Sequence, residues 1–219
     1  MNARFDAVVF DMDGVLVDTE PAFFEGVNIV LEREGSPSIE WERYTRLLGT
    51  SVEHTWREII SMLELPGDLQ HYMRHYGKVL LDCLAQRREP LPGTRELLDA
   101  LEQRAVPFAI ATSSWGPWKD IVLQSAGLQD RFRVTVTGDT VAHEKPAPDI
   151  YLRAAELLRA APERCVAIED TPPGIASAKA AGMFAVQVRA SSTAFPPLEQ
   201  ADLVLASLAE FPLALVTPP

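Results

Sequence analysis

Short apolar segments alternate with polar ones along this chain, and their spacing changes from that of strands to that of helices. Residues 7–10 (AVVF) form a continuous, partly β-branched apolar run, which is typical of a strand buried on both faces of a parallel sheet. Between residues 19 and 88, apolar side chains recur three or four positions apart, with glycine or proline between the groups. This spacing predicts four helices and no strand, within residues 19–34, 39–48, 52–63 and 69–84.

The remainder of the chain alternates between the two patterns. Short apolar runs predict strands over residues 106–111, 134–136, 165–168, 184–188 and 203–205. Helical spacing marks residues 97–101, 121–126, 150–158 and 175–181. Strands that alternate with helices form parallel sheets through right-handed crossovers. We therefore predict an α/β fold, with a Rossmann-like parallel sheet core (residues 1–18 and 89–219) and an inserted all-helical cap domain (residues 19–88).

Composition narrows the class of protein. The chain has 219 residues, of which 47% are hydrophobic, so it can bury a sizeable core. Its apolar runs are far shorter than the roughly 18 residues that span a bilayer, and its start lacks a signal-peptide pattern. We expect a cytoplasmic protein with no membrane partner. Cys83 and Cys165 have no CxxC spacing, which favours buried free thiols over a disulfide.

The net charge of −11 bears on the partner. Nucleic-acid binding needs a basic face, so we expect no nucleic-acid partner. An acidic protein still binds a small phosphorylated metabolite if a divalent cation and a few local donors reverse the sign of the field there. We further expect the chain to act as a monomer.

Two acids follow the first predicted strand. Asp11 comes directly after the apolar run, Asp13 follows one residue later, and Gly14 permits a sharp turn. Ligands of open α/β sheets bind beyond the carboxyl ends of the strands, so both carboxylates are well placed for chemistry. The alternative is a simple turn, because Asp and Gly are ordinary turn residues.

Other reactive side chains follow other strands or lie in the loops beyond them. These are Thr112 with Ser113, Lys145, and Glu169 with Asp170. Each has a structural alternative: the hydroxyls can cap a helix, the lysine can be a solvated loop residue, and acids suit a helix N-terminus. Their common placement at one edge of a parallel sheet favours a shared site.

Phosphoryl transfer is the chemistry that needs this set. Converging carboxylates repel each other, which implies a hard divalent cation, and oxygen ligands without clustered His or Cys indicate Mg²⁺. One carboxylate can attack phosphorus, and a second can protonate the leaving alcohol and then deprotonate water. A hydroxyl, a lysine and the metal together stabilise the charge that develops on the phosphoryl oxygens.

Four segments resemble the motifs of the haloacid dehalogenase-like (HAD) superfamily, in the branch with a helical cap that includes β-phosphoglucomutase and sugar-phosphate phosphatases. They are residues 10–20 (FDMDGVLVDTE), 111–114 (ATSS), 145–149 (KPAPD) and 168–175 (IEDTPPGI), in that order. The resemblance covers nearly the whole chain. Dehalogenating members lack the second aspartate and work without metal, so the presence of Asp13 favours phosphate chemistry.

The resemblance also implies roles for these residues. Asp11 would be the nucleophile and Asp13 the acid/base. Mg²⁺ would be held by Asp11, the backbone carbonyl of Asp13, Glu169 and Asp170. The phosphoryl group would be bound by Thr112, the Ser113 backbone and Lys145. Apart from the resemblance, Ser114 and Trp115 are candidate substrate contacts, because they follow the second motif and the Trp115 indole can stack on a substrate ring there.

Three hypotheses about function follow. The first is a Mg²⁺-dependent phosphatase for a small phosphorylated metabolite such as a sugar phosphate. The second is a phosphohexomutase, although mutase relatives carry a cap histidine near the position of Phe23 and a cap arginine where this chain has Val52 and Glu53. The third is a receiver-like signalling module, which has no use for a helical cap. For an enzyme, we expect the cap to swing on residues 17–19 and 89–93 and exclude water.

Overall fold

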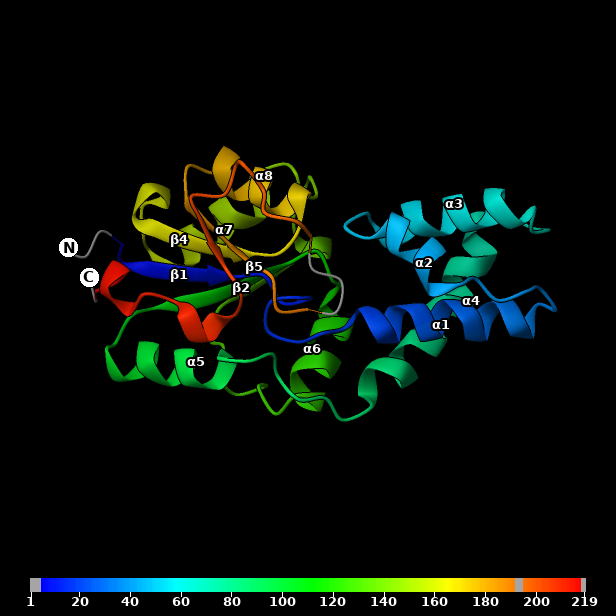
Figure 1. The fold of residues 1–219 in the computed structure, drawn as a ribbon, viewed down its shortest axis with the longest axis horizontal. Helices are drawn as coiled ribbons and strands as arrows, with labels where there is room; N and C mark the ends of the chain where they lie inside the picture. Colours follow the sequence, from blue (N-terminus) through cyan, green and yellow to red (C-terminus); the bar gives the residue numbers. More distant parts are fainter. Residues whose placement is uncertain (1–4, 192–194, 218–219) are drawn as a thin grey trace. The chain divides into compact units, whose positions relative to one another are not determined.

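The structure is a computed structural model that describes residues 5–191 and 195–217. Its sheet has six parallel strands in the order β3-β2-β1-β4-β5-β6 (Figure 1). The strands are β1 (Ala7–Phe10), β2 (Phe108–Thr112), β3 (Thr135–Thr137), β4 (Cys165–Glu169), β5 (Phe184–Val188) and β6 (Leu203–Leu205). The predicted α/β class with a Rossmann-like parallel sheet is confirmed.

Helices cover both faces of this sheet because the direction of strand addition reverses at β1. The chain adds β2 and β3 on one side of β1 through α5 (Thr94–Gln103) and α6 (Gly116–Ser125), then adds β4 and β5 on the other through α7 (Asp149–Leu158) and α8 (Pro172–Ala180). Right-handed crossovers therefore put α7 and α8 on the face opposite α5 (Figure 1). Short 3-10 turns complete this unit: η2 (Gly138–Thr140), η3 (Pro162–Arg164), η4 (Leu208–Glu210) and η5 (Leu213–Leu215).

Strand β1 is buried on both faces, as its apolar run predicts. Alternate side chains point to opposite faces of the sheet. Phe10 packs on one face against Phe108 and Phe132. The other face forms a buried apolar cluster with α7 and α8 that includes Ala7, Val9, Ile150, Ala154, Ile175 and Ala178.

Several boundaries in this unit differ from the prediction, and hydrogen bonds explain two of them. Strand β2 begins at Phe108 instead of residue 106, because Val106 belongs to the turn that closes the end of α5. Its backbone N–H donates to the Leu101 carbonyl at 2.9 Å, and Ala105 has a φ of 54°, as in helix C-terminal caps. Helix α8 begins three residues earlier than predicted, since the Thr171 hydroxyl accepts from the Gly174 N–H and caps a helix whose first residue is Pro172.

Residues 19–87 form a second compact unit, and residues 1–18 and 88–219 form the first. The second unit, called the helical unit below, contains α1 (Glu20–Arg33), α2 (Trp41–Tyr44), η1 (Thr45–Leu47), α3 (Val52–Leu63) and α4 (Leu69–Ala85). Trp56 is fully buried there and stacks on Tyr72 with ring centroids 5.3 Å apart. Arg88, which the sequence analysis placed with the helices, belongs to the first unit, where its N–H donates to the Ser125 carbonyl.

The second predicted helix is shorter than its apolar pattern indicates. The Asn28 side chain on α1 accepts from the Ile39 N–H at 2.8 Å and donates to the Ile39 carbonyl at 3.2 Å. Both backbone groups of Ile39 are therefore engaged outside a helix. The α-helix begins only at Trp41 and passes into the 3-10 turn η1 after Tyr44.

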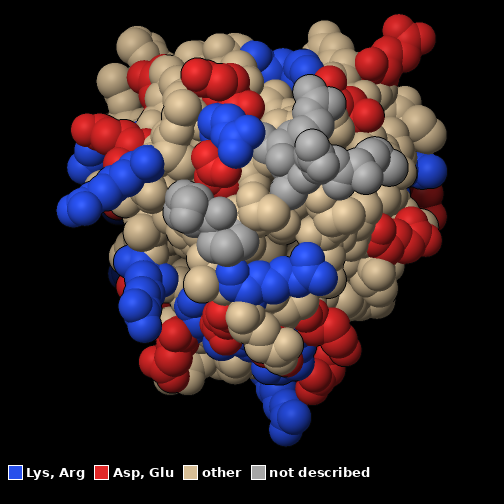
Figure 2. Space-filling model, turned by 90° about the vertical axis from the view of Figure 1, so that its left-hand side faces the viewer, with Lys and Arg blue, Asp and Glu red and all other residues tan. Residues whose placement is uncertain are grey.

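The described residues lack a membrane-spanning helix, carry charged side chains of both signs on their surface and include two cysteines. Among the described residues, no helix is both long enough and apolar enough to span a bilayer. On the face drawn in Figure 2, Lys and Arg side chains lie among Asp and Glu side chains. Cys83 and Cys165 are both buried free thiols, as predicted.

Candidate active site

The register between β1 and β4 brings the first acids together. Phe10 is paired with Ile168, and the Asp11 N–H donates to the Ile168 carbonyl at 2.9 Å. Asp11 and Glu169 therefore emerge side by side at the carboxyl ends of neighbouring strands. One carboxylate oxygen from each of Asp11, Glu169 and Asp170 lies within 4.8 Å of the other two, and all three residues are buried.

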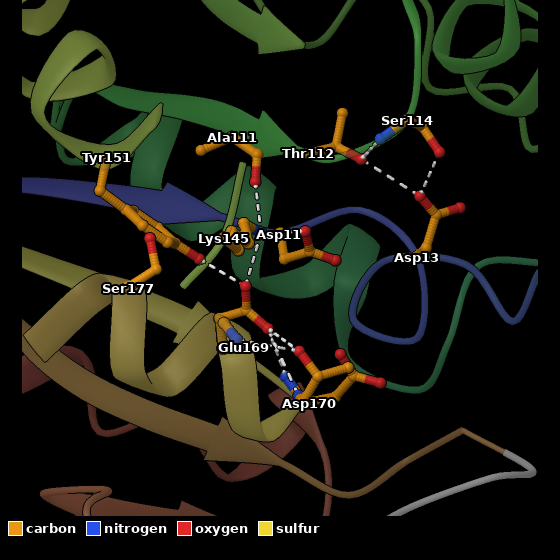
Figure 3. A network of polar contacts seen from close by, with 12 residues as sticks. Asp11, Asp13, Ala111, Thr112, Ser114, Lys145, Tyr151, Glu169, Asp170 and Ser177 are labelled. Atoms are coloured by element: carbon orange, nitrogen blue, oxygen red, sulfur yellow. Dashed lines mark hydrogen bonds and ion pairs between the residues drawn. The ribbon is translucent and has the colours of Figure 1, made fainter. Parts of the chain in front are cut away.

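Lys145 lies in the loop before α7 and joins two of these acids. Its Nζ donates to Asp11 Oδ1 at 2.6 Å, to Glu169 Oε1 at 2.6 Å and to the Ala111 carbonyl at 3.0 Å (Figure 3). Burial opposes the charged form, but the carboxylates of Asp11 and Glu169 outweigh it and raise the pKa of Lys145. The lysine therefore remains a cation.

Burial raises the pKa of Asp11 well above its ordinary value; the nearby carboxylates add to the rise, and Lys145 opposes it. The single charge of Lys145, which pairs with Asp11 and Glu169, balances only part of the charge of three carboxylates. A hard divalent cation would compensate the remaining charge, and three carboxylate oxygens are the donors that Mg²⁺ binds. The residues present thus fit a Mg²⁺ site built from Asp11, Glu169 and Asp170.

A glycine lets the backbone come close to this cluster. Gly14 has a φ of 79°, in the region that favours glycine, and a Cβ placed there would lie 2.1 Å from Asp170 Oδ2. Any larger residue at position 14 would displace the Asp170 carboxylate. This contact explains why glycine follows the second aspartate.

Asp13 has its own surroundings, although it is only two residues from Asp11. Its Oδ2 accepts from Thr112 Oγ1 at 3.1 Å and from Ser114 Oγ at 2.8 Å. Thr112 Oγ1 in turn accepts from the Ser114 N–H at 3.1 Å. These hydroxyls lie at the end of β2 and in the loop directly after it, and they fix the Asp13 carboxylate beside the buried cluster (Figure 3).

The remaining predicted residues lie in the same loop after β2. Ser113 is exposed. The Trp115 side chain is 49% exposed and stacks on Trp118 with ring centroids 5.4 Å apart. Ser114 is buried and its hydroxyl goes to Asp13, so a substrate contact for Ser114 stays a prediction, as does one for Trp115.

Tyr151 also belongs to this cluster, although the sequence pattern does not single it out as a site residue. Tyr151 on α7 is fully buried and its hydroxyl donates to Glu169 Oε1 at 2.8 Å, while its ring lies 5.1 Å below Lys145 Nζ. A signal was present, because Tyr151 shares the apolar face of a predicted helix and a buried tyrosine hydroxyl needs a partner. The pattern alone does not say which partner.

Comparisons with known proteins show the family of this chain. The model of the family described as haloacid dehalogenase-like hydrolase matches residues 8–188. A phosphorylated carbohydrates phosphatase of Thermotoga maritima is 34% identical over 81% of this chain and 82% of its own length. A β-phosphoglucomutase of Bacillus subtilis is 32% identical over 96% of this chain and 93% of its own.

Solved structures agree as well. CbbY from Rhodobacter sphaeroides, crystallised in complex with phosphate, superimposes with a TM-score of 0.83 and 27% identity, over 94% of this chain and 96% of that one. The hydrolase family model matches most of the chain, which argues against the hypothesis of a receiver-like signalling module. The chain is an enzyme that belongs to the haloacid dehalogenase-like hydrolases.

Proposed function

We propose that this enzyme is a Mg²⁺-dependent phosphatase that hydrolyses a small phosphorylated metabolite, with sugar phosphates as the first substrates to test. The observation that carries the proposal is the division of the acids into two groups. Asp11 lies with Glu169, Asp170 and Lys145 in a buried cluster, whereas Asp13 is held beside it by two hydroxyls. Two carboxylates in different surroundings suit two different roles in one reaction.

Asp11 is the proposed nucleophile. One of its carboxylate oxygens forms a bond to phosphorus as the bond from phosphorus to the substrate alcohol breaks, which gives an aspartyl-phosphate. Lys145, 2.6 Å from Asp11 Oδ1, then faces the phosphoryl oxygens and pairs with their negative charge. Bound Mg²⁺, held by Asp11, Glu169, Asp170 and the Asp13 carbonyl, would neutralise further charge on these oxygens.

Asp13 is the proposed acid and base. In its protonated form it gives a proton to the leaving alkoxide, and as a carboxylate it takes a proton from the water that attacks phosphorus in the second step. This second step breaks the bond between Asp11 and phosphorus and releases inorganic phosphate. Thr112 and Ser114 fix the direction of the Asp13 carboxylate through both steps.

The mutase is the second candidate, because a β-phosphoglucomutase is among the relatives. A mutase must hold the unreacting phosphate of a bisphosphate with cationic groups. The positions expected to supply them hold other residues: Phe23 is buried within the helical unit, and Val52 and Glu53 begin α3. These residues favour hydrolysis over phosphate transfer back to a sugar.

A substrate panel separates the two. Purified enzyme with Mg²⁺ is given a set of phosphate esters. The rate at which free phosphate is released is measured for each ester and expressed as kcat/KM. In parallel, β-glucose 1-phosphate is supplied with a trace of its bisphosphate and glucose 6-phosphate is measured. We expect free phosphate from at least one sugar phosphate and little isomerisation. Glucose 6-phosphate with little free phosphate would establish the mutase.

The metal requirement has a separate test. We expect chelation to abolish phosphate release and Mg²⁺ to restore it. Asp170→Asn removes one proposed ligand charge and should raise the Mg²⁺ concentration for half-maximal rate at least about tenfold. Asp120→Asn, on the exposed side of α6, is the matched control. Full activity in chelator would refute the metal requirement.

A further inference from the structure

A second cluster of metal-ligand side chains lies in the helical unit, far in sequence from the residues of the proposed reaction. Glu34 follows the last residue of α1, and His71 and His75 lie four positions apart on α4. Residues four apart on a helix share a face, so both imidazoles point the same way. Helices α1 and α4 belong to the same compact unit and pack together.

The three side chains converge on one point. Glu34 Oε1 lies 3.0 Å from His71 Nε2 and 2.8 Å from His75 Nδ1. The two imidazole rings are 4.3 Å apart between centroids, and one ligand atom from each residue lies within 4.8 Å of the other two. Ligand atoms on a tetrahedral zinc ion are about 3.3 Å apart, so small side-chain rotations would open this triangle around an ion.

The cluster is also accessible to solvent. The exposed fraction of the side chain is 35% for His71, 45% for His75 and 23% for Glu34. A hydrated ion can therefore reach all three and retain water as a further ligand. Glu34 Oε1 faces a ring nitrogen of each histidine, so the carboxylate is directed at the same point as both imidazoles. One carboxylate and two imidazoles thus face one accessible point.

The donor set selects a different metal from the one proposed for the sheet edge. Two imidazole nitrogens and one carboxylate oxygen suit Zn²⁺ and other divalent transition metals, whereas Mg²⁺ takes oxygen ligands. We propose that Glu34, His71 and His75 bind Zn²⁺ and thereby tie the end of α1 to α4. Each imidazole coordinates through the nitrogen that now faces Glu34. A neutral ring moves its proton to its other nitrogen, and a cationic ring loses one proton to solvent.

The test is a Zn²⁺ titration by calorimetry at neutral pH, on full-length enzyme freed of any affinity tag and previously treated with chelator. Saturating Mg²⁺ is present throughout to occupy the carboxylates at the sheet edge. We expect one Zn²⁺ per chain. His71→Ala and Glu34→Gln should each weaken binding at least about tenfold, because a missing ligand costs no less than a missing supporting contact. His54→Ala, an exposed histidine on α3, should bind as the wild type does.

A second measurement identifies the residues without substitution. Diethyl pyrocarbonate modifies accessible histidines, and peptide mass spectrometry reads each position. Zn²⁺ should protect His71 and His75 and leave His54 and His143 modified. The proposal is overturned if no stoichiometric Zn²⁺ binds, or if Zn²⁺ leaves His71 and His75 unprotected. It is equally overturned if binding persists in Glu34→Gln and disappears in Asp170→Asn.

Discussion

At the scale of single residues, the direction of the Asp13 carboxylate depends on two hydroxyls. Ser114 Oγ donates to Asp13 Oδ2 at 2.8 Å from a buried position, and Thr112 Oγ1 donates to the same atom at 3.1 Å. A general acid works only within hydrogen-bond reach of the atom it protonates. Ser114 is therefore a positioning residue in the proposed reaction, acting through Asp13.

Ser114→Ala tests this role. The substitution removes one of the two hydroxyls that donate to Asp13 Oδ2 and leaves the backbone of the loop in place. We expect kcat to fall by roughly tenfold, a fraction of what general acid catalysis contributes, with little change in KM. Ser61→Ala, at an exposed position of α3, is the control. An unchanged kcat would refute the positioning role, and a rise in KM with kcat unchanged would assign Ser114 to substrate binding instead.

The cysteine thiols give a second prediction at this scale. Cys165 is fully buried at the start of β4, and burial raises the pKa of its thiol to about 12. It therefore remains a neutral thiol from pH 6 to pH 9, and only the thiolate reacts with disulfide reagents. We expect no reaction of Cys165 with such a reagent in native enzyme and full reaction after denaturation, read by peptide mass spectrometry. Rapid modification of the native protein would contradict this burial.

The acids of the site could be predicted from the sequence, because a polar side chain at the end of an apolar strand lies at the edge of the sheet. Asp11 and Glu169 were predicted to meet since parallel neighbours end at one edge, and the register confirms that they do. The Tyr151 contact with Glu169 was beyond reach, since its spacing marks it only as a core residue. The cluster of Glu34 with His71 depends on how two helices pack, which spacing along each helix does not specify.

At the scale of elements, the first turn of α8 packs unusually close to the site. A Cβ placed on Gly174 would lie 2.0 Å from Glu169 Oε1. That carboxylate is held by Lys145 at 2.6 Å and by the Tyr151 hydroxyl at 2.8 Å, so it cannot move without breaking these contacts. Helix α8 and strand β4 therefore position the Glu169 side chain jointly.

Two helical glycines make a matched test of this packing. Gly77 in α4 has open space where a Cβ would be, so Gly77→Ala should stabilise the protein by about 0.5–1 kcal/mol through helix propensity. Gly174→Ala gains the same propensity but must displace the buried Glu169 carboxylate. We expect it to lower both the free energy of unfolding and the rate of phosphate release. Urea denaturation and kcat measure the two effects, and equal stabilisation by both variants would refute the packing argument.

Element boundaries were less predictable than element types, for local reasons. The apolar pattern marks Val106 as strand, but its N–H closes the last turn of α5. Similarly, Ile39 carries the helical pattern, yet the Asn28 side chain engages both of its backbone groups. In each case a hydrogen bond to a residue outside the pattern decides the conformation.

At the scale of the whole molecule, the helical unit is an insertion that is joined to the other unit by two chain connections. The division falls between Asp18 and Thr19 and between Arg87 and Arg88. The first of these connections begins only a few residues after Asp13. Any movement of the helical unit about these connections would therefore be transmitted along the chain to the loop that carries the proposed acid.

We predict that the two units close when the site is filled. Exclusion of bulk water strengthens the electrostatic interactions within the site, including that of Lys145 with the phosphoryl oxygens. Small-angle scattering should show a smaller radius of gyration with Mg²⁺ and a phosphate analogue than with Mg²⁺ alone. The same pair of measurements on Asp170→Asn should show little change. Identical radii for the wild type in both conditions would contradict closure.

The nucleophilic role of Asp11 is tested most directly by the kcat of Asp11→Asn on the best substrate of the wild type. The amide keeps the shape of the side chain and cannot form the acyl phosphate, so we predict a fall of at least about 10⁴-fold. Asp120→Asn, whose carboxylate is 72% exposed, should keep the wild-type rate. A rate for Asp11→Asn within tenfold of the wild type, in protein whose mass shows no reversion to aspartate, would contradict the proposed mechanism.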